Sequence, residues 1–171
     1  MMEQRPKQIK QETDMGIEAV KEYFAQYGIA DRVREFDESS ATVELAARAL
    51  GCEPRRIAKT LAFMVDGRAI LVVAAGDAKI DNPKYKAQFG TKAKMLTPEE
   101  TVILVGHPVG GVCPFGIKPG VAVYLDVSLK RFPTVFPACG SFNSAFELSI
   151  EELERYSNCT AWIDVCKNWQ T

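Results

Sequence analysis

The chain has 171 residues, of which 47% are hydrophobic and 25% are charged. These values are typical of one soluble globular domain. A domain of this size buries enough surface to fold without disulfides or a structural metal, which excludes small stapled scaffolds. The 21 Lys and Arg residues nearly balance the 22 Asp and Glu residues, so the composition argues against a broad nucleic-acid-binding surface.

The sequence contains no candidate membrane or secretion segment. Its longest apolar run, 69–75, is far shorter than a membrane helix. Residues 1–16 mix acidic, basic and amide side chains and lack the apolar core of a secretion signal. We therefore expect a flexible polar tail at 1–16, one domain at 17–171 and a cytoplasmic protein.

The five cysteines form no C-x-x-C pair, and His107 is the single histidine. An odd number of cysteines fits reduced thiols better than a disulfide framework. These positions do not provide a zinc site with ordinary local spacing of its ligands. We expect neither a metal nor another cofactor.

The first predicted elements are helices with marked ends. Apolar residues on one helical face over 17–27 are followed by Gly28, and those over 43–50 are followed by Gly51. Glycine at these positions is typical of a helix C-terminus. Residues 54–56 then begin with proline and predict a short helical turn.

A β-hairpin is predicted next. Residues 59–65 and 68–75 are rich in strand-forming side chains and are joined by Asp66-Gly67, a strong turn signal. Lys59 therefore lies at the mouth of a strand.

Two more helices follow the hairpin. One is predicted over 82–89, closed by Gly90. The other starts at Thr97, which is followed by a proline and, three residues later, by Glu100. This pattern is a capping box.

The last third of the chain begins with a loop, 106–120, that holds five of the twelve glycines and three of the nine prolines. Strands are predicted over 121–128, 134–138 and 145–148, and a capping box at Ser149 opens a terminal helix. Helices and strands are thus intermixed, which predicts a single α+β or mixed-sheet domain.

Two features of the sequence suit chemistry. Gly110 and Gly111 lack side chains, so a ligand can approach their main-chain N–H groups, which suit a carbonyl oxygen or an anion. The alternative is an ordinary glycine-rich connection. Lys59 suits a phosphate or a carbonyl oxygen as a point charge, and the alternative is a surface lysine with a packed aliphatic stem.

Three further patterns have weaker support. Residues 77–96 carry five lysines and two aspartates, a net charge of +3, which suits either a solvated helix face or a modest contact with a polynucleotide backbone. His107 and Cys113 suggest a thiol and its base, but no third orienting group is identifiable and a structural role is favoured. Ser141 and Ser144 lack the G-x-S-x-G motif of serine hydrolases.

Several segments together resemble one family, the YbaK and prolyl-tRNA-synthetase-associated editing domains. The matching stretches lie in order at 39–44, 57–61, 76–77 with the lysines after it, 110–114 and 140–148. The resemblance covers about residues 17 to 157 and implies a compact α+β domain. In this fold a mixed, mainly antiparallel β-sheet is surrounded by helices.

The resemblance also implies an activity and its partners. The family hydrolyses the ester that joins a wrong amino acid to the 3′ end of a tRNA, typically proline tRNA, tRNA(Pro), carrying a small amino acid such as cysteine or alanine. It implies a trans-acting hydrolase that binds the aminoacyl-tRNA 3′ end and associates with prolyl-tRNA synthetase, with no membrane or DNA partner. The alternative is a catalytically silent module of the same fold that binds tRNA or the synthetase.

The resemblance assigns residues to the site. Lys59 is expected to engage the terminal nucleotide or the ester, and the G-x-x-x-P loop of 110–114 to position the aminoacyl carbonyl through its main chain. The expected catalytic residues are Lys59, Gly110 and Gly111, and the expected substrate-binding residues are Thr60, Asp77, Val112, Cys113, Pro114, Ser141, Asn143 and Ser144. Some branches carry a histidine in the last region, whereas this chain has none after His107.

An aminoacyl ester is already activated, so its hydrolysis requires only modest acceleration. Orientation and main-chain stabilisation of the oxyanion can supply this acceleration without a metal or a side-chain nucleophile. The attacking group is then water or the thiol of the substrate itself, helped by the neighbouring ribose hydroxyl.

Overall fold

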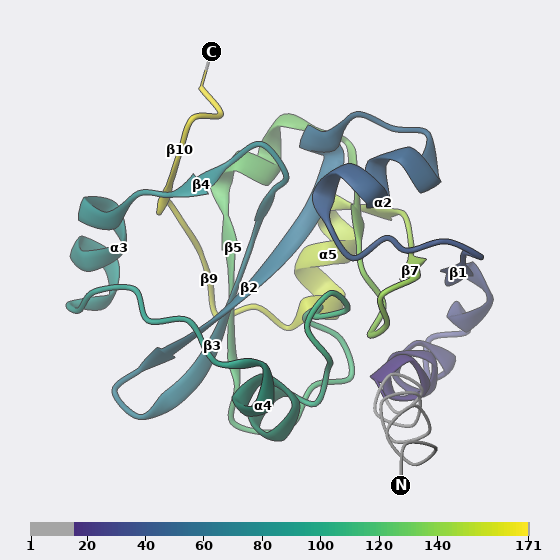
Figure 1. Ribbon diagram of the computed structural model, residues 1–171, viewed down its shortest axis with the longest axis horizontal. Helices are drawn as coiled ribbons and strands as arrows, with labels where there is room; N and C mark the ends of the chain where they lie inside the picture. Colours follow the sequence, from purple (N-terminus) through teal and green to yellow (C-terminus); the bar gives the residue numbers. More distant parts are fainter. Residues whose placement is uncertain (1–15, 171) are drawn as a thin grey trace, which may run out of the picture.

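The computed structural model describes residues 16–170, and its elements are shown in Figure 1. The expected polar tail lies outside these residues except for residue 16, which already belongs to the first helix, 16–25. The further helices are α2 (Val43–Leu50), α3 (Asn82–Phe89), α4 (Pro98–Glu100) and α5 (Ile150–Ser157). Short 3₁₀ turns are η1 (Ala30–Arg32), η2 (Pro54–Arg56) and η4 (Val127–Arg131), and η3 (Thr101–Val105) is a π-helical turn.

The strands form one six-stranded sheet and two small two-stranded sheets. The strands are β1 (Arg34–Glu35), β2 (Ile57–Val65), β3 (Arg68–Ala75), β4 (Lys79–Ile80), β5 (Ala122–Asp126), β6 (Thr134–Pro137), β7 (Ser144–Ala145), β8 (Leu148–Ser149), β9 (Ala161–Ile163) and β10 (Cys166–Lys167). The order in the large sheet is β8-β6-β2-β3-β5-β9, and the small sheets pair β1 with β7 and β10 with β4.

The sheet system is mixed, as expected. Among the described strands, four of the seven pairings are antiparallel and three are parallel, and all three parallel pairings fall within the six-stranded sheet. Helices lie around this sheet (Figure 1). The α+β fold is therefore confirmed.

The predicted hairpin forms the centre of the sheet. β2 and β3 pair from Ala58 opposite Ala75 to Val65 opposite Arg68. Both turn residues have positive φ, 50° at Asp66 and 77° at Gly67, as a two-residue hairpin with the twist of the strands requires.

In the hydrophobic core, helices pack against the sheet and against loops. Val20 and Phe24 of the first helix are completely buried, as is Leu153 of α5. A smaller cluster joins Ala46 and Ala47 of α2 to Ile57 of β2 and Phe136 of β6. This second cluster positions the N-terminus of α2 beside β2, which shapes the site described below.

Two expectations about the C-terminal part are wrong. The strand expected over 145–148 is divided into β7 and β8, because Phe146 is buried between them and the chain changes its partner from β1 to β6. The helix expected to be terminal is followed by β9 and β10. No helix within residues 16–170 has the length and apolar character to cross a membrane.

Candidate functional site

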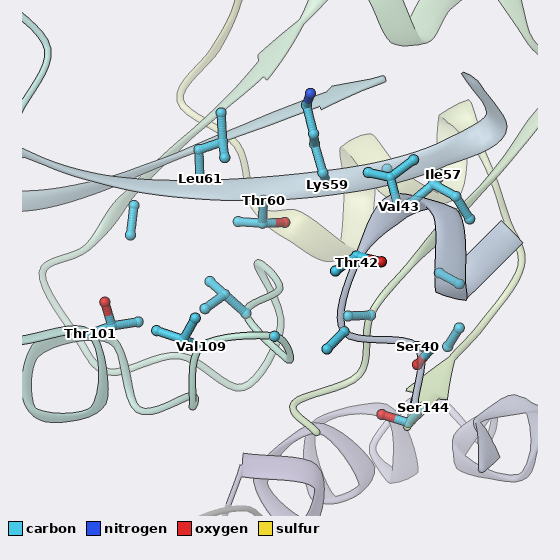
Figure 2. Close-up of a pocket in the computed structure, with 18 of the residues that line it drawn as sticks. Ser40, Thr42, Val43, Ile57, Lys59, Thr60, Leu61, Thr101, Val109 and Ser144 are labelled. Carbon is cyan, nitrogen blue, oxygen red and sulfur yellow. The ribbon is translucent and has the colours of Figure 1, made fainter. Parts of the chain in front are cut away.

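A pocket of about 350 Å³ lies between β2, the N-terminus of α2 and the segments around 95–101 and 109–112 (Figure 2). Five residues expected in the site contribute to its wall: Lys59, Thr60, Gly110, Val112 and Ser144. The remaining six, Asp77, Gly111, Cys113, Pro114, Ser141 and Asn143, are not part of this wall. The structure thus brings together the two features singled out in the sequence, the β2 lysine segment and the glycine loop.

Gly110 brings the loop against the segment before α2. Its φ is +92°, which favours glycine, and a Cβ atom built on it would lie 3.0 Å from the Cβ of Ala41. Within residues 16–170, the main-chain N–H groups of Gly110 and Val112 donate no hydrogen bond. Both are therefore available to an oxygen atom of a ligand.

Gly111 has a different position. Its N–H donates to the carbonyl of Pro108 at 3.0 Å, and its own carbonyl accepts from the N–H of Gly140 at 2.8 Å. A Cβ atom on Gly111 would lie 2.5 Å from the nitrogen of Ser141. Glycine is needed here for close backbone packing behind the pocket wall, and its amide is already engaged.

The segment 141–144 is joined to residues 36–40 by hydrogen bonds. The side-chain amide of Asn143 donates to the carbonyl of Phe36 at 2.9 Å, and the Phe36 N–H donates to the Asn143 carbonyl at 2.7 Å. Ser141 Oγ lies 2.6 Å from Ser144 Oγ and 3.0 Å from Asn143 Oδ1. Asn143 therefore holds the segment 36–40, which leads to Ser40 of the pocket wall, and Ser141 supports Asn143 and Ser144.

The side chain of Lys59 leaves β2 on the face opposite to Thr60 (Figure 2), because successive side chains in a strand alternate between faces. Its ammonium donates to the carbonyl of Gly76 at 3.4 Å and to that of Ala78. Burial of the ammonium lowers the pKa of Lys59. Lys59 thus contributes to the pocket wall, but its ammonium lies on the opposite face of β2, at the turn 76–78.

Thr60 offers polar groups on the pocket side. Its Oγ1 is buried and has no hydrogen-bond partner within the described residues. On the edge of β2 that faces away from β3, the N–H of Met64 donates to the carbonyl of Lys94, and the carbonyl of Ala62 accepts from the N–H of Leu96. On the same edge, β6 pairs only with Ile57 and Ala58. Because main-chain groups alternate in direction along a strand, the N–H and C=O of Thr60 point into the gap between these pairings.

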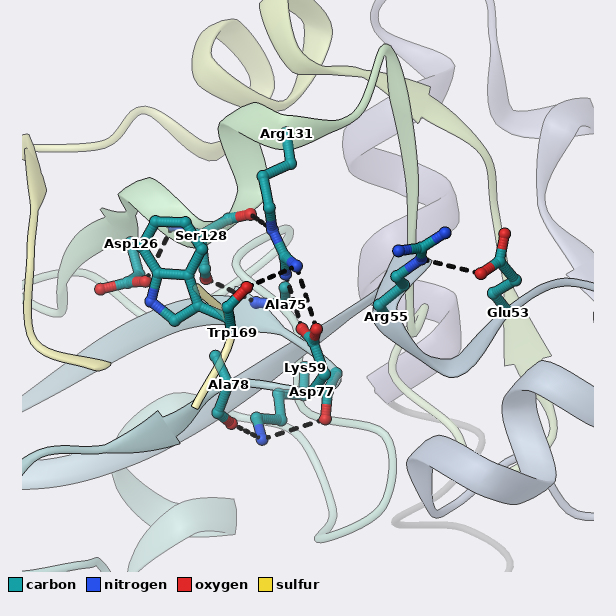
Figure 3. A network of polar contacts seen from close by, with 11 residues as sticks. Glu53, Arg55, Lys59, Ala75, Asp77, Ala78, Asp126, Ser128, Arg131 and Trp169 are labelled. Carbon is teal, nitrogen blue, oxygen red and sulfur yellow. Dashed lines mark hydrogen bonds and ion pairs between the residues drawn. The ribbon is translucent and has the colours of Figure 1, made fainter. Parts of the chain in front are cut away.

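Asp77 lies with the Lys59 side chain rather than in the pocket (Figure 3). Its carboxylate binds the guanidinium of Arg131 through two contacts, of 2.6 Å and 3.0 Å, and Arg131 stacks on Trp169. A bidentate pair of this kind has a fixed geometry. It holds the turn 76–78 whose carbonyls accept the hydrogen bonds of Lys59.

Cys113 and His107 are neighbours but do not form a catalytic dyad. Cys113 Sγ lies 3.6 Å from His107 Nε2, and Nε2 lies 2.7 Å from the carbonyl of Phe115. A nitrogen that donates to a carbonyl cannot accept the thiol proton. Burial raises the pKa of Cys113 to about 12 and lowers the pKa of His107, so the favoured structural role fits both residues. Pro114, the next residue, is also buried.

Much of the pocket wall was not predicted as part of the site. Ser40, Ala41 and Thr42 carry the chain into α2, and they were singled out only as part of the stretch 39–44 that resembles the editing family. The other missed residues are Val43, Ala46, Ile57, Ala58, Leu61, Ala62, Met95, Leu96, Pro98, Thr101, Val109, Phe136, Ala138 and Ala145. Arg131 was also missed, because it reaches Asp77 from 54 positions away.

No group of three or more His, Cys, Asp or Glu side chains among residues 16–170 has the arrangement of a metal site.

Comparison with known families identifies the family to which this fold belongs. A family model described as an aminoacyl-tRNA editing domain matches residues 37–156. The chain belongs to the aminoacyl-tRNA editing domain family. The match includes β2, the glycine loop and the segment 141–144, so the whole pocket lies within the editing domain.

Individual relatives agree with this assignment. The uncharacterized protein YwhH of Bacillus subtilis strain 168 is 55% identical over 157 residues, which are 91% of this chain and 100% of YwhH. The proline–tRNA ligase of Geobacillus kaustophilus is 36% identical over 86 residues, which are 50% of this chain and 15% of the ligase. A solved structure described as a candidate trans-editing enzyme for prolyl tRNA synthetase has a TM-score of 0.80 and 29% identity, and the match covers 89% of this chain and 97% of that one.

Proposed function

We propose that this editing domain is a trans-acting, metal-independent deacylase that hydrolyses the ester of a mischarged tRNA in the cytoplasm. The proposed substrate is tRNA(Pro) carrying a small non-cognate amino acid. The observation that carries the proposal is the pocket itself, with the available N–H groups of Gly110 and Val112 in one wall and Thr60 in the facing wall. The relation to proline–tRNA ligases and to a candidate trans-editing enzyme supports proline tRNA and prolyl-tRNA synthetase as partners.

The size of the pocket favours a small aminoacyl group. Its wall includes Ala41, Ala46, Ala58, Ala62, Ala138 and Ala145. A volume of about 350 Å³ is at the lower end for small-molecule sites. Selection by size alone is worth only about 1–3 kcal/mol per methylene, so we expect overlapping activities on cysteinyl, alanyl and similar esters.

The reaction needs no nucleophile from the protein. Water, or the thiol of a cysteinyl substrate, adds to the ester carbonyl carbon, and the carbonyl oxygen becomes an oxyanion that accepts hydrogen bonds from Gly110 and Val112. The bond from this carbon to the ribose oxygen then breaks, and the proton of the attacking group passes to that ribose oxygen. Attack by water releases the free amino acid and a tRNA with an intact 3′ hydroxyl, whereas attack by the thiol releases a cyclic thiolactone.

Polar groups of β2 orient the substrate in this scheme. The carbonyl and Oγ1 of Thr60 accept hydrogen bonds from the α-ammonium of the amino acid. The Lys59 ammonium has three N–H donors, and the carbonyls of Gly76 and Ala78 use two of them. The third is left for a phosphate oxygen of the terminal nucleotide outside the pocket, because the ammonium lies on the face of β2 opposite to Thr60.

The test is release of amino acid from tRNA(Pro) charged separately with alanine, cysteine, serine and threonine. We expect the purified protein to accelerate release from at least one of these, and Lys59→Ala to lower kcat/KM by about tenfold or more. Lys130→Ala, at an exposed lysine of η4, is the matched control and should retain wild-type rates. Binding without release would overturn the deacylase and support a silent binding module, and an unchanged rate in Lys59→Ala would overturn the role of Lys59.

A further inference from the structure

The segment 82–96 is strongly basic, because it contains four lysines and no acidic residue. One of them, Lys84, is engaged: its ammonium lies 3.0 Å from Asp164 Oδ1 and donates to the carbonyl of Cys166 at 3.2 Å. The other three, Lys86, Lys92 and Lys94, are exposed and form no ion pair with any residue of 16–170. Three positive charges therefore face solvent without a counterion from the described chain.

Folding adds two more lysines at the same end of the molecule. Lys79 of β4 and Lys167 of β10 are direct partners in an antiparallel pair, both exposed and neither in an ion pair within the described residues. β4, β10 and α3 lie beside one another (Figure 1). Like charges directly opposite each other destabilise a strand pair. A bound polyanion would relieve this repulsion.

The basic segment leads directly to the pocket. The carbonyl of Lys94 accepts from the N–H of Met64 at 2.8 Å, and the Leu96 N–H donates to the carbonyl of Ala62 at 3.0 Å. Met95 and Leu96 contribute to the pocket wall, and the Met95 side chain is 59% exposed. The main chain at Lys94 therefore adjoins an exposed residue of the pocket wall.

We propose that Lys86, Lys92 and Lys94, termed here the lysine surface, bind the phosphates of the tRNA acceptor stem while the aminoacylated 3′ end occupies the pocket. This inference rests on the proposed function. Duplex RNA presents regularly spaced phosphates along its backbone, and isolated lysines without counterions bind such a polyanion by releasing its condensed cations. An acidic protein surface would also attract lysines, but the continuity with the pocket favours the RNA that delivers the ester.

The experiment compares two substrates with the same ester. One is full-length mischarged tRNA(Pro), and the other is a short aminoacylated fragment that ends in CCA and lacks the stem. In the triple variant K86Q/K92Q/K94Q, KM for the full tRNA should rise about tenfold. The slope of log KM for the full tRNA against the logarithm of the salt concentration should become shallower by about one unit per lysine. For the fragment, kcat/KM should stay within about twofold of wild type, because the pocket is unchanged.

The control triple variant K21Q/K118Q/K130Q removes the same charge from the first helix, the 106–120 loop and η4. It should behave like wild type on both substrates. Lys79 is left unaltered because its charge also acts on the Lys59 ammonium. Thermal unfolding of each variant shows whether folding is intact.

Several results would overturn the inference. Unchanged tRNA KM and salt dependence, an equal loss on the fragment, or an equal loss in the control triple would each do so. Loss of prolyl-tRNA synthetase binding with an unchanged tRNA KM would assign the surface to the protein partner instead. If the wild-type protein releases amino acid from neither substrate, the proposed function fails, and the dissociation constant of uncharged tRNA for wild type and both triples still tests the lysine surface.

Discussion

Burial controls the reactivity of the individual cysteine side chains. Cys113 and Cys139 are completely buried, and desolvation raises the pKa of both thiols. Because the thiolate is the nucleophilic form, neither group is suited to attack an ester or a disulfide reagent at neutral pH. Cys52 and Cys159 are only partly buried.

We predict that Cys113→Ser retains deacylation within about twofold of wild type, since the proposed reaction uses no protein thiol. A disulfide reagent applied to the native protein should label Cys52 and Cys159 before Cys113 and Cys139, as read by mass spectrometry of the peptides. A folded Cys113→Ser protein that had lost most of its activity would contradict the prediction and revive a thiol mechanism.

At the scale of elements, a capping box positions one side of the pocket. Thr97 Oγ1 accepts from the N–H of Glu100 at 3.1 Å, and the Glu100 carboxylate accepts from the N–H of Thr97 at 2.9 Å. The helix begun there widens into the π-helical turn η3 and ends at Gly106, where φ is +98°. Pro98 and Thr101 of this unit contribute to the pocket wall.

Thr97→Ala should lower the free energy of unfolding by about 1 kcal/mol, because the helix loses its N-cap acceptor. Thr97 is exposed, so little packing is lost with it. Urea denaturation measures the change, with Thr160→Ala, another exposed threonine, as the reference. An equal effect of the two substitutions would show that the cap contributes nothing to stability.

At the scale of the whole molecule, one buried histidine links stability to pH. His107 is completely buried, its Nδ1 has no partner within the described residues, and burial lowers its pKa below the usual 6.5. Between that lowered pKa and pH 6.5 the unfolded chain binds a proton that the folded protein excludes. Stability therefore falls as the pH drops below about 6.5, and the loss ends once the folded protein also binds the proton.

We predict that the free energy of unfolding decreases from pH 7.5 to pH 5.5 with a slope of at most about 1.4 kcal/mol per pH unit from this group. His107→Gln retains a donor for the Phe115 carbonyl but has no titratable group, so its slope in this range should be smaller. Urea denaturation at several pH values tests this. The same slope in both proteins would assign the pH dependence to other groups.

Much of the local structure was predictable because short-range contacts govern it. Asp66 and Gly67 can adopt the positive φ of a tight hairpin without help from residues distant in the sequence. Thr97 and Glu100, three positions apart, accept hydrogen bonds from each other's backbone N–H groups. The two-residue strands were not predictable. β1 exists only because Arg34 and Glu35 meet Ala145 and Ser144, more than a hundred positions along the chain.

The sequence by itself determined the α+β fold, the hairpin and the helix ends, and it singled out the β2 lysine and the glycine loop that the structure places in the wall of one pocket. Tertiary structure alone decided the orientation of these groups. The fold decides that Thr60 faces the pocket while Lys59 faces the turn 76–78 held by the Asp77–Arg131 pair, and that the amide of Gly111 is engaged while that of Gly110 has no partner within the described residues. Hydrogen-bond partners distant in sequence decide such details, because a buried polar group is stable only where the fold brings it a partner.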